Sequence, residues 1–206
     1  MAVLRSRRLQ DLLGAPADSL TYQHLASLAG SGVGEAADLD FKEALYGASE
    51  SNKRSLAVDV AAMANTLGGL VILGVAEDDQ ARAVSVPGVA LSDDEVSRMR
   101  QIVAGQVMPM PAFDIRQLED PATPGRGCLV VMVPPSPIAP HAVVIDKNSL
   151  RYPRRNGATT TYLSESDVAQ AYRDRFTGLQ SKVEATAVLL VRADRRPTAP
   201  PVWAPW

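Results

Sequence analysis

The feature that most constrains the fold is an uninterrupted apolar segment at residues 70–75, Leu-Val-Ile-Leu-Gly-Val. A strand with one face in water alternates apolar and polar residues, so this segment predicts a strand that is covered on both faces. A helix is predicted before it at residues 53–65, where apolar side chains recur with helical spacing. A shorter strand is predicted at residues 38–42. Together these elements indicate an α/β core.

The short strand carries the residues with the clearest chemical potential. Period-two alternation places Asp40 and Lys42 on one face, and Leu39 and Phe41 on the other face toward a core. A carboxylate beside an ammonium group suits phosphodiester chemistry. The carboxylate can hold a divalent cation that activates water, and the lysine can neutralise charge that builds on the phosphate.

The length and composition predict one domain. The chain has 206 residues, of which 46% are hydrophobic, enough to bury one core. We expect a polar lead-in at 1–18, the domain at 19–178 and a C-terminal extension at 179–206, whose Pro-rich end predicts disorder. The other expected elements are helices at 19–30, at 92–103 and after Ser164, strands at 112–118 and 129–133, and a hairpin of 141–145 with 150–152.

The charge and the cysteine content set limits on partners and location. A formal net charge of -2 provides no global attraction for a polyanion, so any nucleic-acid contact must come from a local patch. The single cysteine, Cys128, begins an apolar run and cannot form an intramolecular disulfide, which fits a reducing cytoplasm. The chain shows no export signal and no apolar run long enough for a bilayer. We therefore expect a cytoplasmic protein that does not interact with a membrane.

A basic cluster near the C-terminal third is the candidate patch. It consists of Lys147, Arg151, Tyr152, Arg154 and Arg155, with Asp146 as its internal counterweight. Arginines beside an aromatic ring can hold phosphates and stack on bases, as a binder of single-stranded or looped RNA requires. The alternative is an ordinary charged hairpin.

A phosphate-binding loop of the nucleotide type is not predicted. The turn Asn65-Thr-Leu-Gly-Gly69 follows the C-terminus of a helix, whereas phosphate is held at a helix N-terminus. The motif Gly-x4-Gly-Lys-Ser/Thr does not occur in the chain. The sequence therefore does not predict ATP binding.

Five separate segments form a domain-length pattern. They are Glu35 with Leu39-Asp-Phe-Lys42, Ala61-Ala-Met-Ala-Asn-Thr-Leu-Gly-Gly69, Gly74-Val75, Tyr152-Pro-Arg-Arg-Asn-Gly157 and the helix after Ser164. This pattern, over roughly residues 20–176, resembles the AlbA_2 domain of bacterial regulators and of the animal Schlafen proteins. The resemblance implies a mixed β-sheet flanked by helices, in a single α/β (α+β) lobe, and nucleic-acid binding.

The resemblance also implies a site. Some Schlafen members are metal-dependent ribonucleases, and their acidic positions match Glu35, Asp40 and Asp78 in this chain. These three would hold Mg or Mn, Lys42 would offset the developing charge, and Arg154 with Arg155 would orient the RNA backbone. Asp40 is one methylene shorter than the glutamate common in the family, which pulls the carboxylate back.

Several alternatives stay open. The third acid is Glu77 or Asp79 if the register slips, and the acidic residues could simply be solvated charges with Lys42 as an ion-pair partner. The protein is then a non-catalytic RNA- or DNA-binding regulator. Animal Schlafens join two such lobes, so a homodimer of this single lobe is expected. The weakest alternative is an interaction module that recruits a partner through Trp203 and Trp206.

Overall fold

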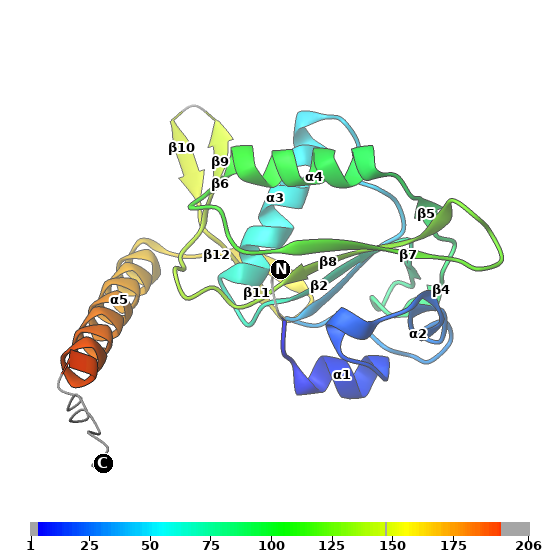
Figure 1. Cartoon of the computed structure of the whole chain (residues 1–206). Helices are drawn as coiled ribbons and strands as arrows, with labels where there is room; N and C mark the ends of the chain where they lie inside the picture. The colour runs from blue at the N-terminus through cyan, green and yellow to red at the C-terminus, as the bar shows by residue number, and fades with distance from the viewer. Residues whose placement is uncertain (1–3, 147, 195–206) are drawn as a thin grey trace, which may run out of the picture.

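The computed structural model describes residues 4–146 and 148–194. The expected disorder of the Pro-rich end and the two tryptophans of the tail lie outside these residues. Within them, the chain forms helices and several small sheets around one larger sheet, as Figure 1 shows. The predicted α/β (α+β) class with a mixed sheet is confirmed.

The central sheet combines parallel and antiparallel pairs. Strand β1 (Leu39–Lys42) runs parallel to β2 (Gly69–Leu73), and β2 pairs antiparallel with β8 (Arg126–Val133). Two further strands, β5 (Val89–Ala90) and β7 (Asp114–Glu119), pair antiparallel with β8. Strand β1 is therefore an edge strand of the sheet.

Helix α3 (Glu50–Ala64) connects the two parallel strands. It begins three residues before the predicted start, because Ser49 caps it by accepting a hydrogen bond of 3.2 Å from the Asn52 amide. The turn that follows brings Gly69 so close to β1 that an added Cβ would lie 2.6 Å from the Asp38 carbonyl oxygen. A glycine is thus required at the start of β2.

Helices cover both faces of the sheet (Figure 1). One core lies between the sheet and the helices α3 and α4 (Asp93–Gln106). The second core lies on the other face, under α1 (Arg7–Leu13), the 3-10 turn η1 (Ala17–Ser19) and α2 (Tyr22–Ala26). All five residues of β2 are buried, so the predicted double coverage is confirmed. The expected lead-in belongs to this second core from Leu4 onward.

Smaller elements surround the sheet. A three-stranded sheet contains β6 (Val107–Met108), β9 (Ala142–Asp146) and β10 (Ser149–Arg151), which confirms the predicted pairing of 141–145 with 150–152. Two hairpins were not predicted: β3 (Ala76–Glu77) with β4 (Ala83–Ser85), and β11 (Pro153–Asn156) with β12 (Thr159–Tyr162). Their strands are short and polar, so they lack an apolar alternation that would reveal them.

The last helix, α5 (Glu165–Asp194), begins where expected and continues well beyond Phe176. Ser164 accepts a hydrogen bond from the Asp167 amide at its start. In Figure 1 the helix leads away from the body of the domain. Of the helices in the described part of the chain, none has the length and apolar character needed to cross a membrane.

Candidate functional site

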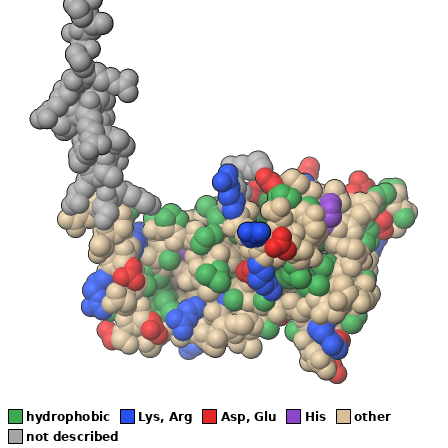
Figure 2. Space-filling model, turned by 90° about the horizontal axis from the view of Figure 1, so that it is seen from below, with side chains coloured by type: hydrophobic (Ala, Val, Ile, Leu, Met, Phe, Trp, Pro, Cys, Tyr) green, Lys and Arg blue, Asp and Glu red, His purple; other side chains and the backbone are tan. Residues whose placement is uncertain are grey.

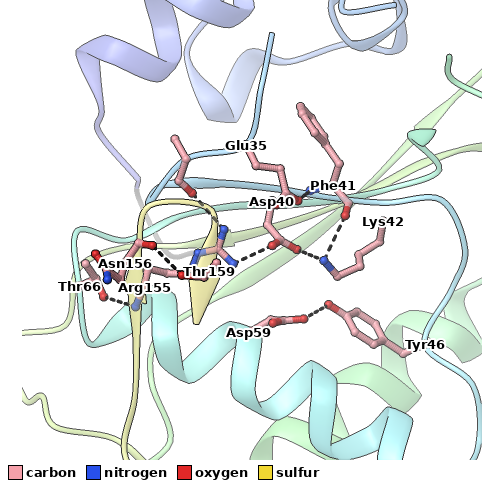
Figure 3. A network of polar contacts seen from close by, with 11 residues as sticks. Glu35, Asp40, Phe41, Lys42, Tyr46, Asp59, Thr66, Arg155, Asn156 and Thr159 are labelled. Atoms are coloured by element: carbon pink, nitrogen blue, oxygen red, sulfur yellow. Dashed lines mark hydrogen bonds and ion pairs between the residues drawn. The ribbon is translucent and has the colours of Figure 1, made fainter. Parts of the chain in front are cut away.

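The centre of the candidate site is the carboxylate of Asp40, which is 2% exposed. Its Oδ1 accepts a hydrogen bond of 2.7 Å from Nη1 of Arg155, and its Oδ2 accepts one from Nζ of Lys42. Arg155 comes from β11, 115 residues along the chain, and the contacts are drawn in Figure 3. Both oxygens of Asp40 are therefore already bound to fixed cations.

Lys42 is the more accessible partner, with 35% of its side chain exposed. Burial acts to lower the pKa of Lys42, but the charges of Asp40 and Asp59 outweigh it and the pKa is raised. Nζ also donates a hydrogen bond of 3.1 Å to the Phe41 carbonyl oxygen. The lysine thus stays charged at neutral pH.

Glu35 lies just before β1 and is half-buried. Its Oε1 accepts a hydrogen bond of 2.6 Å from the backbone N–H of Phe41. Burial, and then the neighbouring charge of Asp40, raise the pKa of Glu35 to about 7. This carboxyl group therefore titrates near neutral pH.

Asp59 and Tyr46 belong to the same network but were missed from the sequence. The Tyr46 hydroxyl donates a hydrogen bond of 2.6 Å to Oδ2 of Asp59, and Figure 3 shows the pair beside Lys42. Burial, and then the charge of Asp40, raise the pKa of Asp59 to about 6. A signal was present, because Asp59 interrupts the otherwise apolar run 56–60 of a core-facing helix.

Asp78 does not join this network. Its carboxylate binds the Arg82 side chain, with Oδ2 at 2.9 Å from Nε and 2.8 Å from Nη2. Its Oδ1 accepts backbone hydrogen bonds from Gln80 and Arg82, so the side chain closes the β3–β4 turn. Of the alternatives, Asp79 is exposed, and Glu77 is close enough for its charge to raise the pKa of Glu35.

The expected three-carboxylate site for Mg or Mn, with Glu35, Asp40 and Asp78 as ligands, does not fit this geometry. Asp40 is occupied by two cations and Asp78 by a third. Among residues 4–146 and 148–194, no group of three or more His, Cys, Asp or Glu side chains is placed to hold a metal ion. The physical reason is that Asp40 and Asp78 bind cationic side chains and Glu35 accepts a backbone hydrogen bond.

The predicted basic cluster is divided by the structure. Arg155 is 5% exposed and also donates to the Ala36 carbonyl oxygen at 3.1 Å, so it cannot contact a nucleic acid directly, which corrects that prediction. Arg154, its neighbour, is exposed. The two differ because consecutive residues of a strand point to opposite faces.

The remaining members of the cluster lie around the hairpin. The guanidinium of exposed Arg151 lies 5.2 Å from the ring centre of Tyr162. Tyr152 is half-buried and makes an edge-to-face contact with Tyr172 at 6.2 Å between ring centres. Lys147 lies outside the described residues. Among the described members of the cluster, Arg151 and Arg154 are the exposed ones.

With this geometry established, residues 35–164 match the family model for the Schlafen AlbA_2 domain. The chain belongs to the Schlafen AlbA_2 family. The AlbA_2 match begins at the edge-capping Glu35 and ends at the Ser164 cap of α5, so it covers the sheet, the β11–β12 hairpin and the whole buried network.

Two solved structures resemble this AlbA_2 domain. The DIP2311 protein of Corynebacterium diphtheriae is 18% identical, with 82% of this chain and 29% of that chain covered and a TM-score of 0.47. The N-terminal domain of a putative ATP-dependent DNA helicase RecG-related protein from Nitrosomonas europaea is 21% identical, with 71% and 95% covered and a TM-score of 0.42. The chain thus spans less than a third of the Corynebacterium protein. No curated protein matches the chain.

Proposed function

We propose that this AlbA_2 domain binds nucleic acid, RNA in preference to DNA, through a surface formed by β10 and the β11–β12 hairpin. We call this the hairpin surface. It consists of Arg151, Arg154, Asn156, Thr159, Thr161 and Tyr162. The observation that carries the proposal is that this segment exposes two arginines, Arg154 on the solvent face of β11 and Arg151, whose guanidinium lies 5.2 Å from the ring centre of the exposed Tyr162.

The pleat of the hairpin separates a core face from a solvent face. Pro153 and Arg155 are buried, whereas Arg154 and Asn156 are exposed. Arg154 is paired across the hairpin with Thr161, so a guanidinium and a hydroxyl lie side by side on one face. The hairpin therefore presents a row of hydrogen-bonding groups to solvent.

These groups suit a single RNA strand. A guanidinium can donate two parallel hydrogen bonds to a phosphate. The Tyr162 side chain is 46% exposed and offers a ring on which a base can stack, next to the Arg151 charge. Threonine hydroxyls can bond a ribose 2′-OH, which DNA lacks. The net charge of -2 makes such a local surface necessary.

The charge distribution is in keeping with a local site. On the face shown in Figure 2, the Lys and Arg side chains form separate small groups between acidic and hydrophobic ones. Cleavage of the bound strand with Mg or Mn is not part of the proposal, because the carboxylates do not fit a metal. The homodimer expected for a single lobe remains a prediction, which light scattering of the purified protein would test.

The experiment is a fluorescence anisotropy titration with a labelled single-stranded RNA and a DNA of the same sequence. We expect tighter binding of RNA, and a loss of about tenfold or more in affinity when Arg151 and Arg154 are both replaced by alanine. The matched control is Arg7→Ala, since the Arg7 side chain is 94% exposed on α1. Equal affinities of the double variant and the unaltered protein would refute the proposal.

The same RNA tests the enzymatic alternative. Incubation with Mg or Mn, followed by electrophoresis, should leave the strand intact. Metal-dependent cleavage that disappears in Asp40→Asn would instead establish a nuclease and would place Asp40 in its active site.

A further inference from the structure

We propose that Asp40 is a positioning residue: the ion triad Lys42–Asp40–Arg155 fixes the β11–β12 hairpin onto the edge of the central sheet, and its two fixed cations stand where a divalent metal would be expected. We also expect the anchor to affect RNA affinity, and this part of the inference rests on the proposed function. The anchoring of the hairpin does not rest on it, and hydrogen exchange tests it separately.

The hairpin needs an anchor because it contributes little core of its own. It is a two-stranded sheet of four residue pairs, and a two-stranded hairpin is at best marginally stable in water. Of its eight strand residues only Pro153 and Arg155 are buried. One of these two is an arginine, so most of the docking must be polar.

Arg155 connects the hairpin to three other segments. Its Nη1 donates to Oδ1 of Asp40 at 2.7 Å, and its Nη2 donates to the Ala36 carbonyl oxygen at 3.1 Å. Its backbone N–H donates to Oγ1 of Thr66 at 3.0 Å. One residue thus ties the hairpin to β1, to the loop before β1 and to the turn that follows α3.

Asn65 supports the same attachment from the α3 end. Its Nδ2 donates to the Pro153 carbonyl oxygen at 2.8 Å and to the His141 carbonyl oxygen at 2.9 Å. The amide therefore holds the start of the hairpin against the chain that enters β9. Asn65 thus holds Pro153 at the start of β11, and Arg155 holds the part of the strand that follows.

The triad also explains why Arg154, and not Arg155, faces solvent. A shift of the hairpin by one residue would exchange its faces, because side chains alternate along a strand. The buried carboxylate of Asp40 accepts a guanidinium at position 155. It thereby directs Arg154 to solvent, where the proposed RNA contact lies.

The occupancy of Asp40 argues against a metal at the same point. A divalent cation would have to displace Lys42 from Oδ2 or Arg155 from Oδ1. Displacement of Arg155 would leave an unpaired charge on a side chain that is 2% exposed, which is strongly unfavourable. Displacement of Lys42 would break its ion pair with the same carboxylate. The two protein cations thus complete the site without an ion.

The test compares Arg155→Met, which keeps the length of the side chain without its charge, with the conservative Arg155→Lys. The control is Arg100→Met, which breaks an ion pair of similar length (2.6 Å) with Asp114, between α4 and β7, whose two side chains are more exposed. Hydrogen exchange by mass spectrometry is followed in residues 153–162 and, as an internal reference, in residues 69–73 of β2.

We expect Arg155→Met to speed exchange in 153–162 by about tenfold or more while 69–73 stay protected, and to weaken RNA binding by a similar factor. Arg155→Lys should recover part of both, and Arg100→Met should change neither. Unchanged exchange in 153–162, or an equal rise in both regions, would overturn the proposal, since the second result means a general loss of stability.

Two further measurements cover a variant that does not fold and the binding of a metal ion. If Arg155→Met does not fold, Thr66→Val provides a second test. It removes the acceptor of the Arg155 amide, together with the bond of 2.8 Å that the Thr66 hydroxyl donates to the Ala62 carbonyl oxygen of α3, and should give the same local rise in exchange. Titration of the RNA-free protein with Mn²⁺, followed by electron paramagnetic resonance, should show no binding that depends on Asp40. Binding lost in Asp40→Asn would overturn the triad. The unaltered protein could fail to bind RNA while Arg155→Met still speeds exchange in residues 153–162 alone. That result would support the anchor and refute the proposed function.

Discussion

Glu35 caps Phe41 at the open edge of the central sheet. The carboxylate accepts a hydrogen bond of 2.6 Å from the Phe41 backbone N–H, on an edge strand. The adjacent Ala36 and Leu39 backbones bond to each other, so this edge is closed by the chain that precedes it. Edges closed in this way cannot add a strand from another chain. The cap is an ionisable group with a pKa of about 7, so its protonation state matters.

The first prediction is that Glu35→Gln changes the pH dependence of stability. The folded-state pKa of about 7 lies above the ordinary value of 4.5, so folding favours the protonated carboxyl. The contribution of Glu35 to stability is therefore full below about pH 4.5 and is lost as the pH rises toward 7. Glutamine keeps the acceptor but cannot titrate.

Urea unfolding at several pH values checks this prediction. Relative to the unaltered protein, Glu35→Gln should be more stable at pH above 7 than at pH below 5. A difference in unfolding free energy that is the same at all pH values would contradict it. Comparison of the two proteins cancels the contributions of titrating groups far from Glu35. The pKa of Lys42, which the charge of Glu35 helps to raise, should fall in the variant.

The second prediction concerns Tyr46→Phe, which removes the hydrogen bond of 2.6 Å to Asp59. We expect a loss of about 1–3 kcal/mol of stability, because Asp59 loses its hydroxyl donor. Tyr46 acts to lower the pKa of Asp59, so the variant should raise that pKa above about 6. The loss of stability should be larger at a pH above the pKa of Asp59, where the group is a carboxylate, than at a pH below it.

Chemical denaturation on both sides of neutral pH, with an NMR titration of the Asp59 carboxyl carbon, provides the measurement. Tyr22→Phe is the matched control, because it removes a tyrosine hydroxyl that interacts with the Val86 carbonyl oxygen, at 3.4 Å, and with Asp120 instead of Asp59. A pKa of Asp59 that does not move would show that the hydroxyl does not stabilise the carboxylate.

The third prediction compares two glycines. A Cβ at Gly127 would lie 2.1 Å from the Leu118 carbonyl oxygen on the neighbouring strand β7, whereas a Cβ at Gly105 on α4 would meet nothing within 4 Å. Gly127→Ala should cost about 3 kcal/mol or more, since backbone must move. Gly105→Ala should stabilise by about 0.5–1 kcal/mol through helix propensity. Thermal unfolding of both variants measures the contrast, and similar midpoints would contradict it.

The fourth prediction is the salt dependence of RNA binding. Each phosphate contact to a single strand contributes about 0.7 to the slope of log K against log salt. Replacing Arg151 and Arg154 by alanine should therefore reduce the slope by about 1.4. Anisotropy titrations over a range of NaCl concentrations measure it. A lower affinity with an unchanged slope would mean that these arginines do not contact phosphate.

Local pattern was enough to predict the core. The apolar run at 70–75 became the fully buried β2, and the alternation at 38–42 placed Leu39 and Phe41 in the core and Asp40 beside Lys42. Such features depend on neighbours in sequence, whose geometry is set by helix and strand periods. The AlbA_2 pattern, read from the same segments, was confirmed as well.

The choice of partner for each charge was decided only by the tertiary structure. Alternation shows that Arg154 and Arg155 face opposite ways, but two adjacent arginines are equivalent until Asp40, 115 residues away, binds one of them. Likewise Asp78 was expected beside Asp40 but binds Arg82, while the unpredicted Asp59 takes part in the network. Charges act through space and compete for partners, so the division between a buried anchor and an exposed contact depends on distances that exist only in the folded chain.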